Sequence, residues 1–177
     1  MKYIEKYESP IGKIILASDE ESLTGLWFEG QKYFPHIPPD AEAAGKDLPV
    51  MSMTKKWLDI YFQGEEPDFM PALCPAGTPF RREVWEILQR IPYGNTMTYG
   101  EIGQLLAKKH GRQNMSAQAV GQAVGHNPVS ILIPCHRVLG KGNALTGYAG
   151  GVEKKLMLLK LEKVTDYEDI ERRFVKG

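Results

Sequence analysis

The sequence has few cysteines and no long hydrophobic run, and each absence excludes a class of protein. Its 177 residues contain only Cys74 and Cys135, too few for a disulfide framework. No stretch approaches the roughly 18 apolar residues that a membrane-spanning helix needs. The first twelve residues carry four charges and no apolar signal-peptide core. We therefore expect a cytoplasmic protein with free thiols, in which any special cysteine has a chemical role.

The chain also has no net charge, which by itself argues against a protein that binds polyanions. The charges are nevertheless spread unevenly. Residues 1–79 hold 7 Lys and Arg against 13 Asp and Glu, residues 80–141 hold 8 against 3, and residues 142–177 hold 7 against 6. The basic middle part would suit a phosphate backbone, but a solvated basic surface would give the same count.

A proline-rich stretch suggests how the chain is organised. Its length allows either one compact core or two small lobes. Residues 11–30 contain two apolar runs around a polar break, which predicts a β-hairpin. Residues 53–62 place apolar side chains near helical spacing. Residues 67–79 contain four prolines and are the best candidate for a linker.

Three helix starts follow this linker, and their caps are Thr78, Thr98 and Ser116. Pro79 suits the first turn of a helix that should stop before Pro92. Glu101, three residues after Thr98, completes a capping-box pattern. Ser116 precedes a helix over residues 117–124 that is rich in Ala and Gly. A helix, a polar break and a second helix of small residues form the outline of a helix-turn-helix.

The remaining segments surround the second cysteine. The apolar run at residues 131–133 is too short for a free helix and predicts a buried strand or extended segment. Residues 140–151 predict a glycine-rich loop. Residues 152–164 predict an amphipathic helix with one apolar face.

Cys135 lies in the motif Pro134-Cys135-His136-Arg137-Val138, beside an imidazole and a guanidinium. A free thiol titrates at about 8.5, and neighbouring cations lower that pKa and enrich the nucleophilic thiolate. Because adjacent residues on an extended chain point to opposite faces, the link from Cys135 to His136 could need a bridging water. A buried structural cysteine also explains the pair. Metal binding is disfavoured, since no second pair of ligands has suitable spacing.

Three motifs together resemble the O6-alkylguanine-DNA alkyltransferase family. They are Gly125-His126-Asn127-Pro128, Ile133-Pro134-Cys135-His136-Arg137-Val138 and Gly147-Tyr148-Ala149-Gly150-Gly151. The resemblance covers residues 78–165 and extends to the N-terminal region. It implies an α/β (α+β) fold: a ribonuclease H-like lobe with a small antiparallel sheet at residues 1–77, a mainly helical DNA-binding and catalytic domain with a winged helix-turn-helix-like motif at 78–165, and a C-terminal tail at 166–177.

The resemblance also implies a suicide reaction that needs neither cofactor nor metal. Cys135 would take the alkyl group from O6 of guanine in DNA and keep it as a thioether. His136 would deprotonate the thiol through a water, and Glu162 would orient His136. Tyr99 would face N3 of the departing guanine as a donor. Without the resemblance, Glu162 would be taken for a surface helix residue and Tyr99 for a core aromatic.

The remaining implied site residues contact the base or the DNA. The family pattern assigns the pocket wall and base contacts to Pro134, Arg137, Val138, Tyr148, Ala149 and Gly150, and a supporting tie to Asn127. The target base must be flipped out of the duplex, and small residues such as Ala119 and Gly121 would let the helix approach the minor groove. Tight packing inside the protein would also explain small residues there. Gln118 stands where the family has an intercalating arginine; it can fill the gap but lacks the charge.

Other functions remain to be weighed against this one. A cysteine hydrolase using Cys135, His136 and Glu162 would turn over many times. A non-enzymatic lesion-binding relative would lack the cysteine, and a helix-turn-helix regulator would usually be a dimer with polar base-reading side chains. We expect a monomeric, single-turnover methyltransferase that acts on double-stranded DNA containing O6-alkylguanine and has no membrane partner. The sequence does not decide whether O4-alkylthymine is also accepted.

Overall fold

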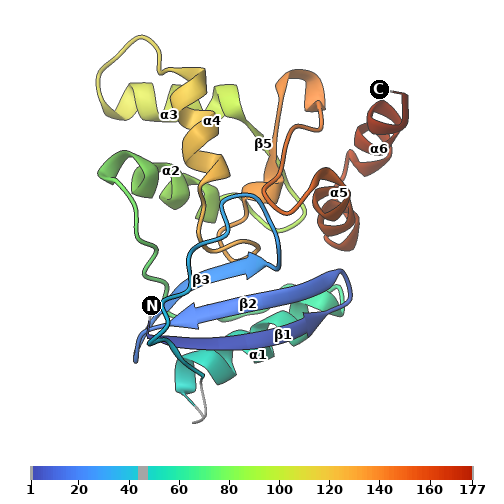
Figure 1. Cartoon of the computed structure of the whole chain (residues 1–177). Helices are drawn as coiled ribbons and strands as arrows, with labels where there is room; N and C mark the ends of the chain where they lie inside the picture. Colours follow the sequence, from blue (N-terminus) through green and yellow to red (C-terminus); the bar gives the residue numbers. More distant parts are fainter. Residues whose placement is uncertain (1, 44–47, 177) are drawn as a thin grey trace. The chain divides into compact units, whose positions relative to one another are not determined.

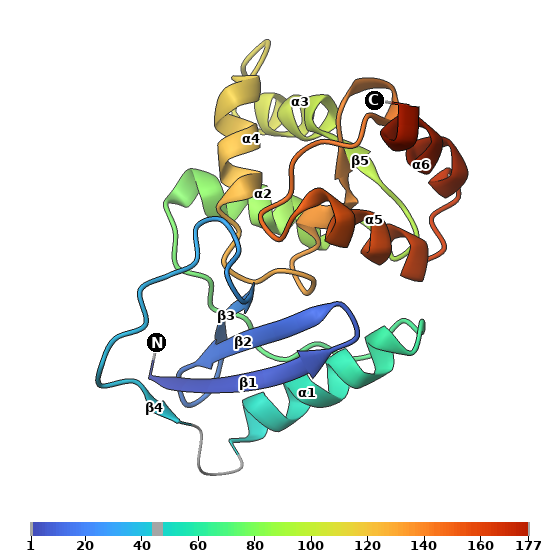
Figure 2. The same ribbon diagram turned by 45° about the vertical axis from the view of Figure 1, so that its right-hand side comes forward.

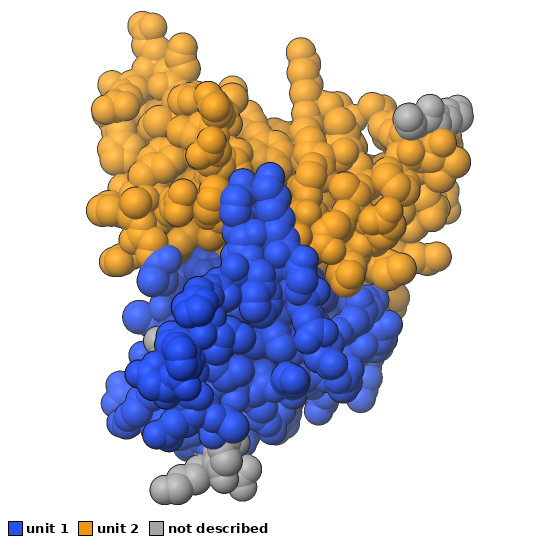
Figure 3. Space-filling view, viewed as in Figure 1, with its two compact units in different colours: residues 1–76, 128–132 blue, residues 77–127, 133–177 orange. Residues whose placement is uncertain are grey.

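The computed structural model of the protein describes residues 2–43 and 48–176. The chain divides into two compact units, which Figure 3 shows in different colours. The first unit comprises Met1–Ala76 and Pro128–Leu132, and the second comprises Gly77–Asn127 and Ile133–Gly177. The short segment Pro128–Leu132 therefore returns to the first unit just before Cys135. Within it, Val129 forms a parallel bridge with Leu26.

The first unit is built on a four-stranded sheet in the order β3-β2-β1-β4. The strands β1 (Tyr3–Ser9), β2 (Gly12–Ser18) and β3 (Leu23–Phe28) are antiparallel neighbours, and the short β4 (Glu42–Ala43) pairs parallel to β1. The apolar run of the central strand β2 is buried. Helix α1 (Pro49–Phe62) lies along the sheet (Figures 1 and 2). The predicted hairpin and helix are confirmed, whereas β1 was not predicted.

The second unit begins with three packed helices, α2 (Pro79–Gln89), α3 (Tyr99–Lys109) and α4 (Ala117–Gly125). Each begins at the predicted cap. The side chains of Thr78, Thr98 and Ser116 accept hydrogen bonds from backbone N–H groups three residues later, and Thr98 with Glu101 forms the predicted capping box. The buried indole of Trp85 donates to the carbonyl of Ala123 at 2.8 Å and so fixes α2 against α4. The caps fix the start of each helix, and the Trp85 bond fixes α4, the second helix of the helix-turn-helix, against α2.

The second unit also contains a small parallel sheet of β5 (Met97–Thr98) and β6 (Val138–Leu139). Helix α5 (Val152–Leu161) and helix α6 (Tyr167–Lys176) follow at the C-terminal end. Buried apolar side chains from β6, α5, α6 and the link between the two helices form one cluster: Leu139, Leu159, Val164 and Ile170. Helix α6 is not predicted from the sequence, and it occupies most of residues 166–177, which were expected to form a C-terminal tail.

The segment before the cysteine corrects the sequence analysis. Residues 131–133 were expected to form a strand or an extended segment, but they form turns and a bend, with Ile131 at a φ of 71°. Their backbone groups are bonded locally, for example from Leu132 N–H to the carbonyl of Ser130 at 2.8 Å. The segment is buried as expected, because burial depends on apolar side chains and not on sheet pairing. Cys135–Arg137 form a single 3-10 turn, so the expected alternation of side chains does not apply.

In the part of the chain that the structure describes, no helix is long and apolar enough to span a bilayer.

Candidate functional site

Cys135 begins the 3-10 turn that precedes β6 and is only 6% exposed. The backbone just before it is held from α4: Asn127, which follows that helix, donates from Nδ2 to the carbonyl of Ile133 at 2.7 Å. The bond is buried, and it ties the end of the helix-turn-helix to the cysteine segment. Asn127 therefore lies where a supporting residue was expected.

His136, Arg137 and Glu162 form a buried hydrogen-bonded cluster. His136 Nε2 lies 2.6 Å from Glu162 Oε1. The guanidinium of Arg137 approaches the same carboxylate with two nitrogens, Nε at 2.9 Å from Oε2 and Nη2 at 3.0 Å from Oε1. Paired, parallel bonds of this kind are the strong form of an arginine–carboxylate interaction. The structure thus brings together the histidine and glutamate that the family pattern singled out.

Glu162 is 2% exposed and caps the C-terminus of α5. The alternative of a surface helix residue is therefore wrong. The sequence predicts a helix through residue 164, but α5 ends at Leu161. Glu162 follows the last helical residue, and its side chain is directed into the protein. The backbone N–H of Gly94 also points to Glu162 Oε2, at 3.4 Å. Gly94 has a φ of 78°, a conformation that favours glycine.

Arg137 does not lie as a residue that contacts a base would. Its side chain is buried, and besides Glu162 it donates from Nη1 to the carbonyl of Ile91 at 2.6 Å. The guanidinium also lies over the ring of Tyr93. Its hydrogen-bonding capacity is directed into the protein, which favours a role in holding Glu162.

The charges of this cluster explain the protonation of each group. Burial alone would raise the pKa of Glu162, but His136 and Arg137 outweigh it and hold that pKa well below its usual range. Burial lowers the pKa of His136, and Glu162 offsets only part of this effect. Because Arg137 already supplies the positive charge that Glu162 needs, His136 rests as a neutral imidazole. A neutral imidazole can accept a proton.

The pKa of Cys135 shifts opposite to the sequence-based expectation. Burial raises it, and the hydrogen bond from Asn127 and the charge of Lys155 oppose this rise without reversing it. The two adjacent cations that were expected to favour a thiolate do not act as such: His136 is neutral, and Arg137 is paired with Glu162. The resting cysteine is therefore a thiol.

Tyr99 is the first residue of α3, and its phenol belongs to a second polar group that the sequence analysis missed. Thr146 donates from Oγ1 to the oxygen of Tyr99 at 3.1 Å. Lys155, fully buried in α5, donates from Nζ to Thr146 Oγ1 at 3.2 Å and to its carbonyl at 3.3 Å. One signal was available: Lys155 falls among Val152, Leu156 and Leu159 on the apolar face of the predicted helix.

The residues expected to meet DNA lie on α4 and beside it. Gln118 is exposed, and Ala119 and Gly121 are half-buried. A methyl group added at Gly121 would meet no atom within 4 Å, so internal packing does not require glycine there. Ala123 is buried, by contrast, and its small size suits the packing against α2. Tight packing inside the protein therefore explains the small residue on the buried face of α4, and close approach to DNA remains the explanation for those on its open face.

Tyr99 also lines a hollow of about 360 Å³ between α3 and the start of α4. The other lining residues are Gly100, Gly103, Gln104, Gln113, Asn114, Met115 and Ala117. The expected wall residues Pro134 and Val138 are buried next to Cys135 in sequence, whereas Tyr148, Ala149 and Gly150 are half-buried in the loop before α5.

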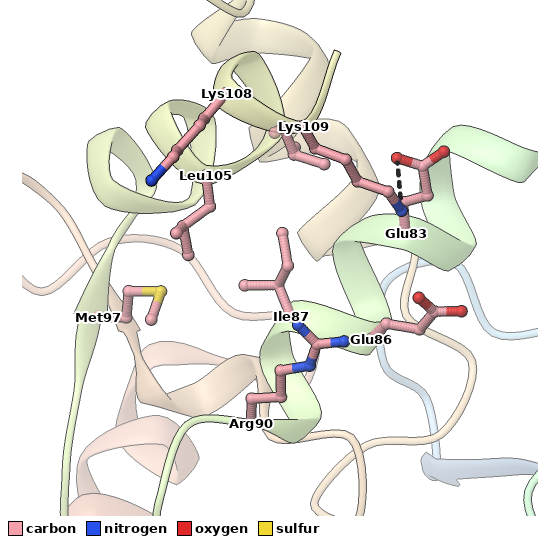
Figure 4. A pocket seen from close by; sticks show the side chains of 9 residues that line it. Glu83, Glu86, Ile87, Arg90, Met97, Leu105, Lys108 and Lys109 are labelled. Carbon is pink, nitrogen blue, oxygen red and sulfur yellow. Dashed lines mark ion pairs between the residues drawn. The ribbon is translucent and has the colours of Figure 1, made fainter. Parts of the chain in front are cut away.

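A second hollow, of about 480 Å³, contains none of the predicted site residues. It lies between α2, α3 and β5, and its apolar lining comprises Ile87, Met97 and Leu105, which Figure 4 labels, together with Leu106. Its charged rim includes the ion pair between Lys109 and Glu83, at 3.5 Å. Among the described residues, no three His, Cys, Asp or Glu side chains gather as metal ligands would.

Comparisons with known proteins match both parts of the chain. The ribonuclease-like domain of 6-O-methylguanine DNA methyltransferase matches residues 2–73, and the DNA binding domain of the same family matches residues 79–164. The methylated-DNA–protein-cysteine methyltransferase of Haemophilus influenzae is 40% identical over 92% of this chain and 87% of its own length. That of Methanosarcina acetivorans is 44% identical over 90% of this chain and 97% of its own.

Solved structures agree with these matches. The Mycobacterium tuberculosis O6-methylguanine methyltransferase is 41% identical, covers 92% of this chain and 93% of its own, and superposes with a TM-score of 0.77. The same organism's OGT in complex with DNA covers 91% of this chain and 92% of its own at a TM-score of 0.75, also with 41% identity. With both domains matched and such identity over most of its length, the chain belongs to the 6-O-methylguanine DNA methyltransferase family.

Proposed function

We propose that the protein repairs DNA by moving a methyl or other alkyl group from O6 of guanine to Sγ of Cys135, once per molecule. The observation that carries the proposal is the buried cluster of His136, Glu162 and Arg137 beside Cys135, within the part of the chain that matches the family's DNA binding domain. The named relatives are methylated-DNA–protein-cysteine methyltransferases.

The transfer is a displacement at the alkyl carbon. Sγ forms a bond to that carbon as the bond from carbon to O6 breaks, and the electron pair of the broken bond stays on guanine. Because the resting cysteine is a thiol, its proton must leave as the attack begins. Nε2 of His136 is bonded to Glu162, so Nδ1 accepts that proton through a water. Glu162 then stabilises the imidazolium, as the orienting acid does in other nucleophile–base sites.

Arg137 acts in this scheme as a positioning residue. It keeps Glu162 ionised and fixes its direction with two hydrogen bonds, so the carboxylate is aimed at His136 before the reaction. This role replaces the base contact that the family resemblance suggested. Tyr99 donates a hydrogen bond to the departing guanine, which would otherwise leave as a bare anion.

Cys135 is buried, so a base within a duplex cannot reach it. The target guanine must be extruded into the protein. Helix α4 supports this step, because Gln118 is exposed near its start and the open space at Gly121 permits close approach to a groove. We infer that the partner is double-stranded DNA carrying O6-alkylguanine and that the protein binds it as a monomer. The two free thiols suit the reducing cytoplasm.

The mass of the protein after reaction tests the proposal. Incubation with excess O6-methylguanine duplex should add the mass of one CH2 unit per molecule, located on Cys135. Cys135→Ala should abolish the label while retaining DNA binding, and Cys74→Ala should leave it intact. A multiple-turnover hydrolase would instead release product beyond one equivalent and leave the cysteine unmodified. Label on Cys74 would also contradict the proposal.

A further inference from the structure

Lys155 is a fully buried lysine that the proposed reaction does not use. Its ammonium donates to both oxygens of Thr146, and Thr146 donates in turn to the oxygen of Tyr99. Three segments are linked in this way: α5, the loop before it, and the first turn of α3. Burying an ammonium group is costly unless hydrogen bonds or nearby charges compensate. An apolar side chain would fill the same place on the buried face of α5 without that cost.

The chemistry of the three groups gives the chain of hydrogen bonds a direction. An ammonium group has donors and no acceptor, so the Thr146 oxygen must accept from Lys155. The Thr146 hydroxyl donates its one hydrogen to the Tyr99 oxygen, which accepts it. The phenol has one hydrogen, and that hydrogen must point away from Thr146. A phenol that accepts a hydrogen bond also becomes a stronger donor.

We propose that Thr146 and Lys155 are positioning residues that orient the Tyr99 phenol and strengthen it as a donor to the departing guanine. The inference rests on the proposed function, since it concerns the leaving group of that reaction. The Thr146 hydroxyl is central to this arrangement, because it accepts a hydrogen bond from Lys155 and donates one to Tyr99.

Electrostatics supports this arrangement. Burial raises the pKa of the Tyr99 phenol, and the bond from Thr146 lowers it again in part. Burial lowers the pKa of Lys155 to about 8, against an opposing effect of the Cys135 thiol. Besides Cys135, the charge of Lys155 acts on His136, whose pKa it lowers. Lys155 is therefore largely protonated at neutral pH and loses its proton in the mildly alkaline range.

The first test compares two substrates that differ at one atom. Single-turnover transfer to Cys135 is measured with duplex O6-methylguanine and with the 3-deaza analogue, in which C–H replaces the N3 acceptor. Thr146→Val keeps the shape and removes the hydroxyl, and it should slow transfer from the guanine duplex roughly ten-fold. With the analogue, wild type and Thr146→Val should react alike. Thr146→Ser should restore most of the rate, and the exposed Thr165→Val serves as the matched control.

The second test is the pH profile of the same variants. The advantage of wild type over Thr146→Val should shrink as the pH rises from 7 to 9, because Lys155 loses its charge there. Equal slowing on both substrates, no rescue by serine, or a constant ratio across this range would overturn the inference and leave Thr146 a structural residue. Wild-type protein that never acquires an alkyl group on Cys135 would instead overturn the proposed function, and this inference with it.

Discussion

Glu162 receives hydrogen bonds from His136, from Arg137 and, at a longer distance, from the backbone of Gly94. Its carboxylate both orients the imidazole and neutralises a buried guanidinium. Those two duties make different demands on the side chain. Orienting His136 needs an acceptor at one oxygen, whereas neutralising Arg137 needs a full negative charge.

Glu162→Gln separates these duties, because it keeps the shape and removes the charge. We expect slower transfer at neutral pH, by roughly ten- to a hundred-fold, since a correctly placed general base contributes about that much or more. Affinity for DNA should change little, because the side chain is buried. Single-turnover rates and DNA binding measured in parallel would check this, with Glu153→Gln, exposed in the first turn of α5, as the matched control. An unchanged rate in a folded variant would show that Glu162 has no part in activation.

At the scale of elements, the helices α2, α3 and α4 were predictable because their starts are encoded locally. A capping threonine or serine and the backbone N–H groups it binds lie within four residues of one another. The burial of the Glu162 side chain could not be predicted from such local signals. It depends on where α5 ends and on Arg137, which is 25 residues away along the chain. Only the family resemblance selected it.

The prediction of a strand or extended segment at residues 131–133 was wrong for a related reason. A short buried apolar run looks the same whether its backbone bonds are made to a sheet or within local turns. The sequence did not single out Lys155 and Thr146, because a charged or polar residue type does not show which distant residues its side chain will contact. Their significance appears only when the loop before α5 meets the first turn of α3.

Helix α4 yields a prediction of its own. If exposed Gln118 fills the space left by the flipped guanine, Gln118→Ala should slow repair of a duplex several-fold, because flipping costs a few kcal/mol that the side chain partly offsets. Reaction with free O6-benzylguanine, which needs no flipping, should be nearly unaffected. Gln122→Ala, one turn later, is the matched change in helix propensity. Equal losses on both substrates would assign Gln118 to helix stability.

For the whole molecule, the buried cluster predicts a loss of stability in acid. The pKa of Glu162 is lowered on folding, so its contribution is present above its unfolded value near 4.5 and disappears as the pH falls. The pKa of His136 is also lowered, so below about 6.5 the unfolded chain binds a proton that the folded protein does not. Both effects act in the same direction.

We therefore expect the free energy of unfolding, measured by chemical denaturation, to fall steadily from pH 7 to pH 4. Glu162→Gln should be less stable than wild type at pH 7, because Arg137 loses its countercharge, and the difference should begin to narrow only as the pH falls below about 4.5. A wild-type stability that stays flat across this range would contradict the charge assignment of the cluster.

The internal pairing of Arg137 with Glu162 has a consequence for how dissolved ions affect the reaction. Mobile ions screen exposed charges within a Debye length but act weakly on pairs sealed inside a protein. Alkyl transfer to Cys135 from a small uncharged donor should therefore proceed at nearly the same rate at low and at high salt concentration. Affinity for a DNA duplex must fall at high salt concentration. Phosphates that bind the protein release their counterions, and this release is less favourable when the salt concentration is high. Ionic strength alone should thus separate recognition from chemistry in the unaltered protein.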